Sequence, residues 1–205
     1  MTDTKRTAAI VLAAGASSRM GRNKMLEVVQ GESVVRRAVR TAIDAHLAPV
    51  IVVLGHQADV VQAELRDLDC ITVINPDFTG PTSTSVHAGL GALPDDVGAA
   101  VIILADMVLV SSGMLSSLVA HASASHAPLV ASRYGTVQAP PLLVTRPLFG
   151  ELLAYHGDGV GRVVMQQHRA EAVFVVWPEV LLTDIDTPDD LRTVHALHAG
   201  RSTTA

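Results

Sequence analysis

Residues 9–24 limit the possible folds and functions of this chain more than any other segment. Their first part, Ala9-Ile10-Val11-Leu12-Ala13-Ala14, is apolar throughout and predicts a strand that is buried on both faces. The second part opens at Gly15 and carries the cations Arg19 and Lys24 among small and polar residues. Glycine lets a ligand approach the backbone closely, and successive free backbone N–H groups bind anions. A buried strand that ends in such a loop therefore indicates a polyphosphate site.

Two common phosphate-binding patterns do not fit this loop. The Walker pattern needs Gly, four residues and then Gly-Lys-Ser/Thr, whereas five residues separate Gly15 from Gly21 here, and Arg22 follows. The dinucleotide fingerprint needs a second glycine where Ser17 stands. What remains is the spacing L-x-A-G-x-x-x-R-M-G-x-x-K over residues 12–24. The alternative is an ordinary surface loop with solvated cations.

The whole chain alternates strand-like and helix-like segments. Strands are expected over residues 8–14, 50–54, 71–74, 99–104, 129–132, 141–144 and 172–176. Helices are expected over residues 33–46, 59–68, 85–93, 111–125, 146–168 with a turn at 157–159, and from Pro188 onward. This alternation predicts an α/β layered fold with a mainly parallel sheet, in which ligands bind at the carboxyl ends of strands. We expect one domain over residues 1–199 and a frayed tail over residues 200–205.

Composition and charge favour a protein that acts on small molecules. Aromatic residues make up only 3% of the chain, so nucleic-acid bases would find few stacking partners, and the net charge of -5 disfavours binding to a nucleic-acid backbone. Met1–Arg6 lacks the apolar segment of a signal peptide, and no apolar run is long enough to span a membrane. The single cysteine, Cys70, is expected to be a buried structural thiol. We therefore expect a cytoplasmic protein without nucleic-acid or membrane partners.

Three aspartates are candidate metal ligands. Asp106 follows an apolar strand, where a carboxylate needs hydrogen bonds, a metal ion or an open cleft. Asp184 and Asp186 would share one face of an extended segment, with Ile185 on the other. Both could bind Mg²⁺ or cap the helix that follows, and Asp106 could equally be a cap or a solvated strand end.

A hydroxyl-rich stretch, residues 79–85, follows the third expected strand. Its side chains Ser83, Thr84 and Ser85 could bind the base or ribose of a nucleotide. They could equally cap the next helix, and the two roles are compatible.

Nearly the whole chain resembles the MobA-like nucleotidyltransferases, and among them the CTP:molybdopterin cytidylyltransferases most. The resemblance rests on residues 12–24, Asn75-Pro76, 80–85, Asp106, 141–146, 157–162 and 184–191. Leu12-Ala13-Ala14-Gly15 resembles the cytidylyl branch, since guanylyl enzymes usually carry a second glycine where Ala14 stands. The resemblance implies a three-layer Rossmann-like nucleotidyltransferase fold, with a mixed, mainly parallel sheet flanked by helices.

The resemblance also implies a reaction and its residues. A nucleoside monophosphate, CMP from CTP, would move to a phosphorylated acceptor, molybdopterin, with release of pyrophosphate, and a molybdoenzyme would receive the product. The implied catalytic residues are Arg19, Lys24 and Asp106, and Asp106 with Asp186 would hold Mg²⁺ or Mn²⁺. The implied nucleotide-binding residues are Leu12, Ala13, Ala14, Gly15, Arg19, Gly21, Lys24, Gly80, Ser83 and Ser85.

Two departures from the family pattern leave the acceptor open. Ala105-Asp106-Met107-Val108 stands where the family typically has Gly-Asp-Gln-Pro, and Ala139-Pro140 stands where it has Gly-His. The alternatives are a nucleotidyltransferase for a sugar, polyol or phospholactate-type phosphate, and a weakly catalytic protein that binds and delivers a cofactor.

Overall fold

Seven strands form one mixed sheet in the computed structural model, which describes residues 6–201. Their order is β5-β4-β1-β6-β8-β7-β9. The strands are β1 (Arg6–Ala13), β4 (Val50–Leu54), β5 (Ile71–Ile74), β6 (Val97–Leu104), β7 (Leu129–Tyr134), β8 (Val137–Thr145) and β9 (Val173–Trp177). Strand β8 runs antiparallel to β6 and β7, and the other pairs are parallel. The mixed, mainly parallel sheet expected from the sequence is confirmed.

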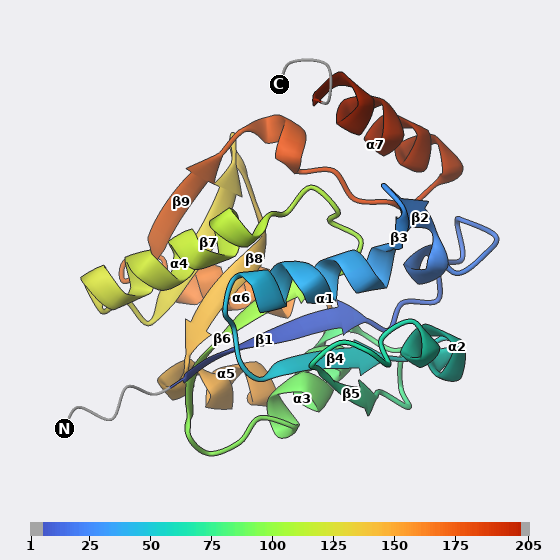
Figure 1. Cartoon of the computed structure of the whole chain (residues 1–205). Helices are drawn as coiled ribbons and strands as arrows, with labels where there is room; N and C mark the ends of the chain where they lie inside the picture. The colour runs from blue at the N-terminus through green and yellow to red at the C-terminus, as the bar shows by residue number, and fades with distance from the viewer. Residues whose placement is uncertain (1–5, 202–205) are drawn as a thin grey trace.

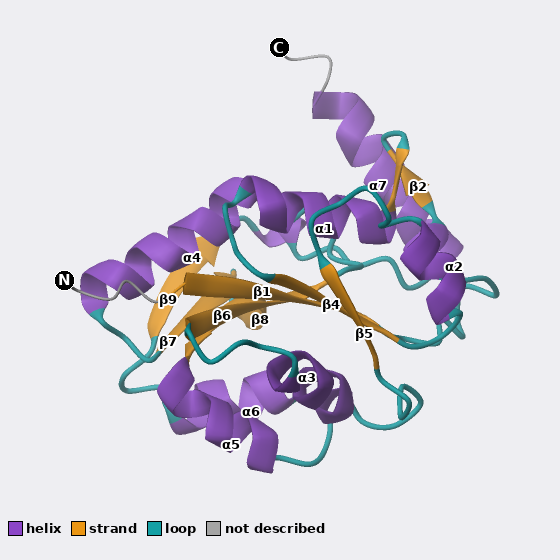
Figure 2. Ribbon diagram, turned by 60° about the horizontal axis from the view of Figure 1, so that its bottom comes forward, coloured by secondary structure: helices purple, strands orange, loops and turns teal. Residues whose placement is uncertain are grey.

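Helices cover both faces of this sheet, which gives three layers (Figures 1 and 2). Figure 2 shows α1 (Val34–Asp44), α4 (Ser112–Ser125) and α7 (Pro188–Arg201) on one side, and α3 (Thr82–Gly91), α5 (Phe149–Ala154) and α6 (Val160–Gln167) on the other. Consecutive residues of a strand point to opposite faces. Val11 of β1 accordingly packs in the core under α1 and α4, and Ile10 packs in the core under α3 and α5.

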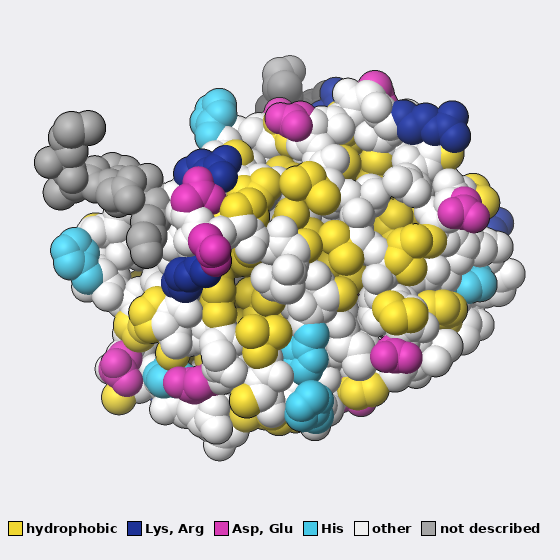
Figure 3. Space-filling view, turned by 90° about the horizontal axis from the view of Figure 1, so that it is seen from below, with side chains coloured by type: hydrophobic (Ala, Val, Ile, Leu, Met, Phe, Trp, Pro, Cys, Tyr) yellow, Lys and Arg dark blue, Asp and Glu magenta, His cyan; other side chains and the backbone are white. Residues whose placement is uncertain are grey.

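Shorter elements complete the chain. Helix α2 (Ala58–Ala63) connects β4 to β5, and β2 (Val28–Val29) pairs with β3 (Glu32–Ser33) in a separate small hairpin. Three 3₁₀ turns are η1 (Lys24–Leu26), η2 (Arg146–Leu148) and η3 (Glu179–Leu181). Seen from below in Figure 3, apolar side chains gather on the face of α3, α5 and α6, and charged side chains lie mostly toward its margin.

Two helix boundaries differ from the sequence prediction. The helix expected over residues 59–68 ends as α2 at Ala63. Its next carbonyl, that of Glu64, accepts a hydrogen bond from Nη1 of Arg36 instead of continuing the helix. Helix α3 begins at Thr82 rather than near Ser85. Its first N–H groups find distant acceptors, the Asp158 carboxylate and the Gly157 carbonyl, so no hydroxyl side chain has to cap it.

Strand β8 is longer than expected and contains Pro140 and Pro141 in its interior. Ala131 of β7 pairs with Leu142 and Ser132 pairs with Ala139, so both prolines occupy the irregularity between these pairs. A proline donates no backbone hydrogen bond, and a bulge is a place where a strand tolerates one. The expectation of a strand that starts at Pro141 was therefore wrong.

The remaining expected elements occur within two residues of their expected bounds. Helix α7 extends to Arg201. The rest of the expected tail, residues 202–205, and residues 1–5 of the polar N-terminal stretch lie outside the described residues. Within residues 6–201, each helix is too short or too polar to cross a membrane.

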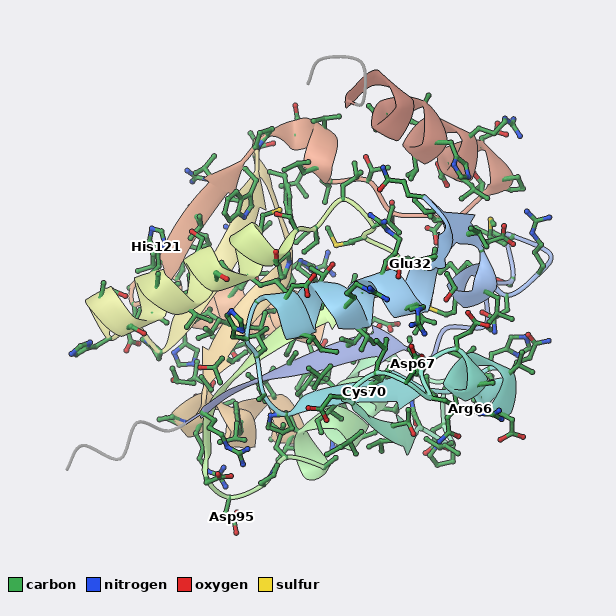
Figure 4. All side chains as sticks on the ribbon, viewed as in Figure 1. Glu32, Arg66, Asp67, Cys70, Asp95 and His121 are labelled. Atoms are coloured by element: carbon green, nitrogen blue, oxygen red, sulfur yellow. The ribbon has the colours of Figure 1, made fainter. Side chains whose placement is uncertain are left out.

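Cys70 lies between α2 and β5, beside the labelled Asp67 (Figure 4). Its side chain is half-buried rather than fully buried and packs against the core under α1. This partial burial raises the pKa of the thiol, which makes the reactive thiolate less abundant.

Candidate active site

A cavity of about 250 Å³ lies at the carboxyl ends of β1 and β6, where the sequence analysis expected a ligand. The ends of the two strands are held together because the backbone N–H of Ala105 donates to the carbonyl of Leu12 at 3.1 Å. The cavity is lined by Leu12, Ala13, Ala14, Gly15, Lys24, Met25, Phe78, Gly80, Thr82, Ser85, Leu104 and Asp106. The loop after β1 and the hydroxyl-rich stretch therefore face the same space.

The loop after β1 is fixed by its own polar side chains. Oγ of Ser17 accepts a hydrogen bond from the backbone N–H of Lys24 at 3.1 Å. Oδ1 of Asn23 accepts one from Met25 N–H, and its Nδ2 donates to the carbonyl of His56 beyond β4. Asn23 and Lys24 are buried as a result, at 6% and 9% exposure. The loop thus presents Lys24 as a positioned cation rather than a solvated one.

Lys24 connects two carboxylates from distant parts of the chain. Its Nζ lies 2.5 Å from Oδ2 of Asp106 and 2.8 Å from Oδ1 of Asp186. The other oxygen of Asp186 lies 2.6 Å from Nη2 of Arg19, whose side chain is 70% exposed. All four residues were singled out in the sequence, and the structure brings them together in one charge network.

Burial and charge act against each other in this network. Burial disfavours the ammonium form of Lys24, but Asp106 and Asp186 outweigh it and raise the lysine pKa. Burial also raises the pKa of Asp106, an effect that Lys24 counteracts. Lys24 is therefore held protonated, and it balances negative charge that would be costly without a partner.

Asp186 and Arg19 are not among the lining residues of the cavity, but Asp186 reaches Lys24 because the segment before α7 pairs with the end of β6. The backbone N–H of Ile185 donates to the carbonyl of Asp106 at 3.2 Å, and the Ile185 side chain is fully buried. Asp184 is exposed and Asp186 is half-buried, as the expected alternation requires. Oδ2 of Asp190 accepts hydrogen bonds from the N–H groups of Asp186 and Thr187, which fixes the turn into α7.

The start of α3 positions the hydroxyl groups. Nδ2 of the buried Asn75 donates to Oγ1 of Thr84 at 2.9 Å and to Oγ of Ser85 at 3.0 Å. Ser85 lines the cavity. Ser83 does not, because its side chain is 1% exposed and its Oγ accepts a hydrogen bond from Gly157 N–H. Gly21 also lies outside the lining, on the exposed side of the loop after β1.

Phe78 forms a wall that the sequence analysis did not identify. It packs over Gly55, where a Cβ atom would lie 2.4 Å from Cβ of Phe78 and 2.6 Å from the carbonyl oxygen of Ala14. Only glycine fits at this point, just after β4. The other lining residues that were missed are Met25, Thr82 and Leu104. Met25 follows the predicted Lys24, and Leu104 ends the strand that precedes the predicted Asp106. The position of Phe78, in contrast, depends on its close packing against Gly55.

A second cavity, of about 350 Å³, adjoins the first. It shares Leu12, Thr82 and Leu104 with the first cavity and extends toward β8 and α6. Ala139 and Pro140, which replace the Gly-His of the family pattern, form part of its wall. The two cavities therefore lie side by side, with Leu12, Thr82 and Leu104 in the wall between them.

The acidic residues fit a metal ion that binds together with a phosphate ligand. Among residues 6–201, no three His, Cys, Asp or Glu side chains gather closely enough to hold an ion alone. Asp106 and Asp186 do converge, since both contact Nζ of Lys24. Mg²⁺ is commonly bound through one or two carboxylates with substrate phosphates and waters. This pair therefore matches the oxygen ligands that Mg²⁺ or Mn²⁺ takes in nucleotide sites.

Comparisons with known proteins agree with this geometry. The model of the MobA-like NTP transferase domain matches residues 9–173. The bifunctional protein GlmU of Corynebacterium aurimucosum is 31% identical over 180 residues, which cover 83% of this chain and 35% of GlmU. The chain thus spans between a quarter and about a third of the length of the curated relatives it matches.

Two solved structures share the fold. Rv0371c of Mycobacterium tuberculosis H37Rv superposes with a TM-score of 0.84 at 24% identity, covering 94% of this chain and 98% of Rv0371c. The same protein has also been solved in complex with manganese. The molybdopterin-guanine dinucleotide biosynthesis protein A of Archaeoglobus fulgidus superposes with a TM-score of 0.65 at 16% identity, covering 94% of this chain and 99% of that protein.

Proposed function

Because the chain belongs to the MobA-like NTP transferase family, a family of nucleotidyltransferases, we propose that it transfers CMP from CTP to a phosphorylated acceptor. The family resemblance and the α/β nucleotidyltransferase fold expected from the sequence are confirmed. The choice of CTP rests on Ala14, which lines the cavity. At this position in the sequence, guanylyl enzymes usually carry a second glycine.

One observation supports the proposal: two carboxylates converge on Lys24, and Lys24 and Asp106 line a cavity beside the loop after β1. A structural ion pair needs neither a glycine loop nor an adjoining cavity. A triphosphate site needs the cation, the glycine loop and the cavity together, because the charge of the triphosphate must be neutralised while its α-phosphorus stays accessible to the acceptor.

In this proposal, different residues of the site position the nucleotide and neutralise its charge. Gly15 and its neighbours let the backbone approach the phosphates, and Arg19 and Lys24 compensate their charge. Ser85 and Gly80 line the side of the cavity for the nucleoside. Asp106 and Asp186 would hold Mg²⁺, and a bound Mg²⁺ would supply charge neutralisation at the reacting phosphates. The manganese complex of Rv0371c makes Mn²⁺ the second candidate.

The reaction needs no covalent intermediate with the protein. An oxygen of the acceptor phosphate attacks the α-phosphorus and forms a new P–O bond. The bond between the α-phosphorus and the oxygen that bridges to the β-phosphate breaks, and pyrophosphate leaves with the electron pair. Positioning and charge compensation dominate such transfers, which are the tasks that Arg19 and Lys24 can perform.

The second cavity is the site for the acceptor. Molybdopterin is the first acceptor to test, and a molybdoenzyme would then receive the product. The altered Ala139-Pro140 wall also supports the alternative of a different phosphorylated acceptor. A delivery protein with little catalysis is a third possibility, distinguished by tight acceptor binding without turnover.

Release of pyrophosphate tests the proposal. The chain is incubated with CTP, GTP, ATP or UTP, with Mg²⁺ or Mn²⁺, and with molybdopterin or a sugar phosphate. We expect release that depends on metal and acceptor and is fastest with CTP. Asp106→Asn and Asp186→Asn should lower the rate by about a hundredfold or more, as removal of a charge-stabilising group does. Asp189→Asn, which changes an exposed aspartate paired with Arg192, serves as the matched control.

A further inference from the structure

The second cavity is lined mainly by hydrocarbon. Its walls include Val86 of α3, Ile102 and Leu104 of β6, Leu142 of β8, and Val160 and Met165 of α6. Among the described lining residues, Thr82, Gln138 and Arg162 have polar side chains, and Arg162 alone carries a charge. A cavity of about 350 Å³ with such walls suits a small ligand with a largely apolar surface.

The apolar walls are held firmly in place. Gly161 packs so closely on β8 that a Cβ atom there would lie 2.9 Å from Cδ2 of Leu142. The N–H and Oγ1 of Thr82 both donate to Oδ1 of Asp158, at 2.9 and 3.2 Å. These contacts tie the start of α3 to the loop before α6. The lining is therefore set by packing rather than by movable surface side chains.

The apolar cavity is continuous with the proposed nucleotide site. Leu12, Thr82 and Leu104 line both cavities, and Leu104 lies two residues before Asp106 in the chain. A ligand in the apolar cavity can thus direct one anionic group toward the Lys24 cluster. Its remaining hydroxyl groups would lose their hydrogen bonds to water and find few replacements.

We propose that the acceptor carries its phosphate on a largely apolar ring or chain rather than on a polyhydroxylated sugar or polyol. This inference rests on the proposed function and narrows the class of acceptor at that same site. It favours the alternative of a different phosphorylated acceptor over molybdopterin, because a pterin ring carries many hydrogen-bonding nitrogen and oxygen atoms. Ala139 and Pro140 strengthen it, because both add hydrocarbon to the wall at positions where the family pattern has Gly-His.

Cyclohexyl phosphate and myo-inositol 1-phosphate form a matched pair of probes. Both carry a phosphate on a cyclohexane ring, and only the second has hydroxyl groups on the other ring carbons. Each is titrated calorimetrically into the full chain, alone and with Mg²⁺ and α,β-methylene-CTP. We expect cyclohexyl phosphate to bind at least about tenfold more tightly in both conditions. Equal or tighter binding of the inositol phosphate, or no binding of cyclohexyl phosphate, overturns the inference.

A pair of substitutions on α6 locates the bound ring. Val160→Thr places a hydroxyl in the apolar cavity at nearly constant volume and should weaken cyclohexyl phosphate binding by about tenfold. Val163→Thr makes the same change on the same helix, but Val163 faces a separate cavity beside Ala154 and Gln167. It should leave the affinity unchanged. Unaltered binding to Val160→Thr, or equal losses in both variants, contradicts the placement of the ring.

The result separates this inference from the proposed function. Binding of CTP with Mg²⁺ is measured first, without any acceptor, and its absence counts against the proposed function. If CTP binds normally but pyrophosphate is released faster with myo-inositol 1-phosphate than with cyclohexyl phosphate, the inference of an apolar acceptor is refuted and the proposed function stands.

Discussion

Lys24 Nζ lies 2.5 Å from Oδ2 of Asp106, although the two residues are 82 positions apart in the chain. The same ammonium group contacts Asp186, so it occupies the side of both carboxylates where a metal ion would bind. Lys24 therefore acts as an internal counterion to both carboxylates. A triphosphate that draws Lys24 toward its own oxygens would free both carboxylates, which couples nucleotide binding to metal binding.

Lys24→Met should increase the affinity for Mn²⁺ in the absence of nucleotide by about tenfold or more, because it removes a competing cation from two carboxylates. It should also destabilise the fold by about 3–5 kcal/mol, because a buried carboxylate loses its partner. Electron paramagnetic resonance of free Mn²⁺ measures the affinity, and urea unfolding measures the stability. Adding Asp106→Asn should abolish the gain in affinity. Equal Mn²⁺ affinity in wild type and Lys24→Met would show that Lys24 does not compete with the metal.

Arg19→Gln should weaken CTP binding by about tenfold, since a charged hydrogen bond to phosphate is lost. Arg22→Gln is the matched control, because Arg22 lies in the same loop but pairs with Glu27, whereas Arg19 pairs with Asp186 of the charge network. Calorimetric titration of CTP with Mg²⁺ into each variant provides the comparison. Equal losses in the two variants would mean that the loop contributes only diffuse positive charge.

Gly89→Ala should destabilise the fold by about 1–3 kcal/mol, because the added Cβ would lie 2.4 Å from Cγ2 of Ile10 and would force α3 away from β1. Gly91→Ala, on the same helix with nothing within 4 Å, should instead stabilise it by about 0.5 kcal/mol. Urea unfolding of both variants gives the two free energies. Destabilisation of similar size at both positions would contradict the packing of α3 on β1.

The ion pair between His168 and Glu151 should make stability depend on pH. Their Nε2 and Oε2 atoms lie 2.7 Å apart, and this hydrogen bond raises the His168 pKa above its ordinary 6.5, with Glu171 adding to the effect. A raised pKa in the folded state means that the contribution to stability is complete below the ordinary value. It is lost as the pH rises through the raised value.

Wild type should therefore exceed Glu151→Gln in free energy of unfolding by more at about pH 5.5 than at about pH 8.5. Urea unfolding at both pH values measures this difference. If the difference in free energy of unfolding between wild type and Glu151→Gln is the same at both pH values, or larger at the higher pH, the ion pair between His168 and Glu151 does not cause the pH dependence.

Much of the lining of the first cavity could be predicted because it depends on local sequence. Gly15 and Asp106 follow the apolar ends of β1 and β6, Lys24 lies in the loop after β1, and parallel strands end at a common edge of the sheet. Asp186 was identified from its alternation with Ile185, but its contact with Lys24 depends on a backbone hydrogen bond between Ile185 and Asp106, which no local pattern encodes.

The second cavity could not be predicted in the same way. Its walls come from α3, β6, β8 and α6, and they include Pro140, one of the two prolines in the bulge of β8. Periodicity predicted a shorter strand there, since a proline usually ends a ladder. The early start of α3 was missed for a related reason: its first N–H groups bond to Gly157 and Asp158, residues far away in the sequence.

Metal-dependent binding of CTP tests the central claim most directly. Calorimetric titration of CTP into the wild-type chain, with and without Mg²⁺, should show binding that is at least about tenfold tighter with the metal and tighter for CTP than for GTP, ATP or UTP. Asp106→Asn should remove the effect of the metal, and Lys24→Met should weaken nucleotide binding in its presence. No binding of any nucleoside triphosphate, or binding that neither the metal nor these substitutions change, would contradict the assignment of this site to nucleotidyl transfer.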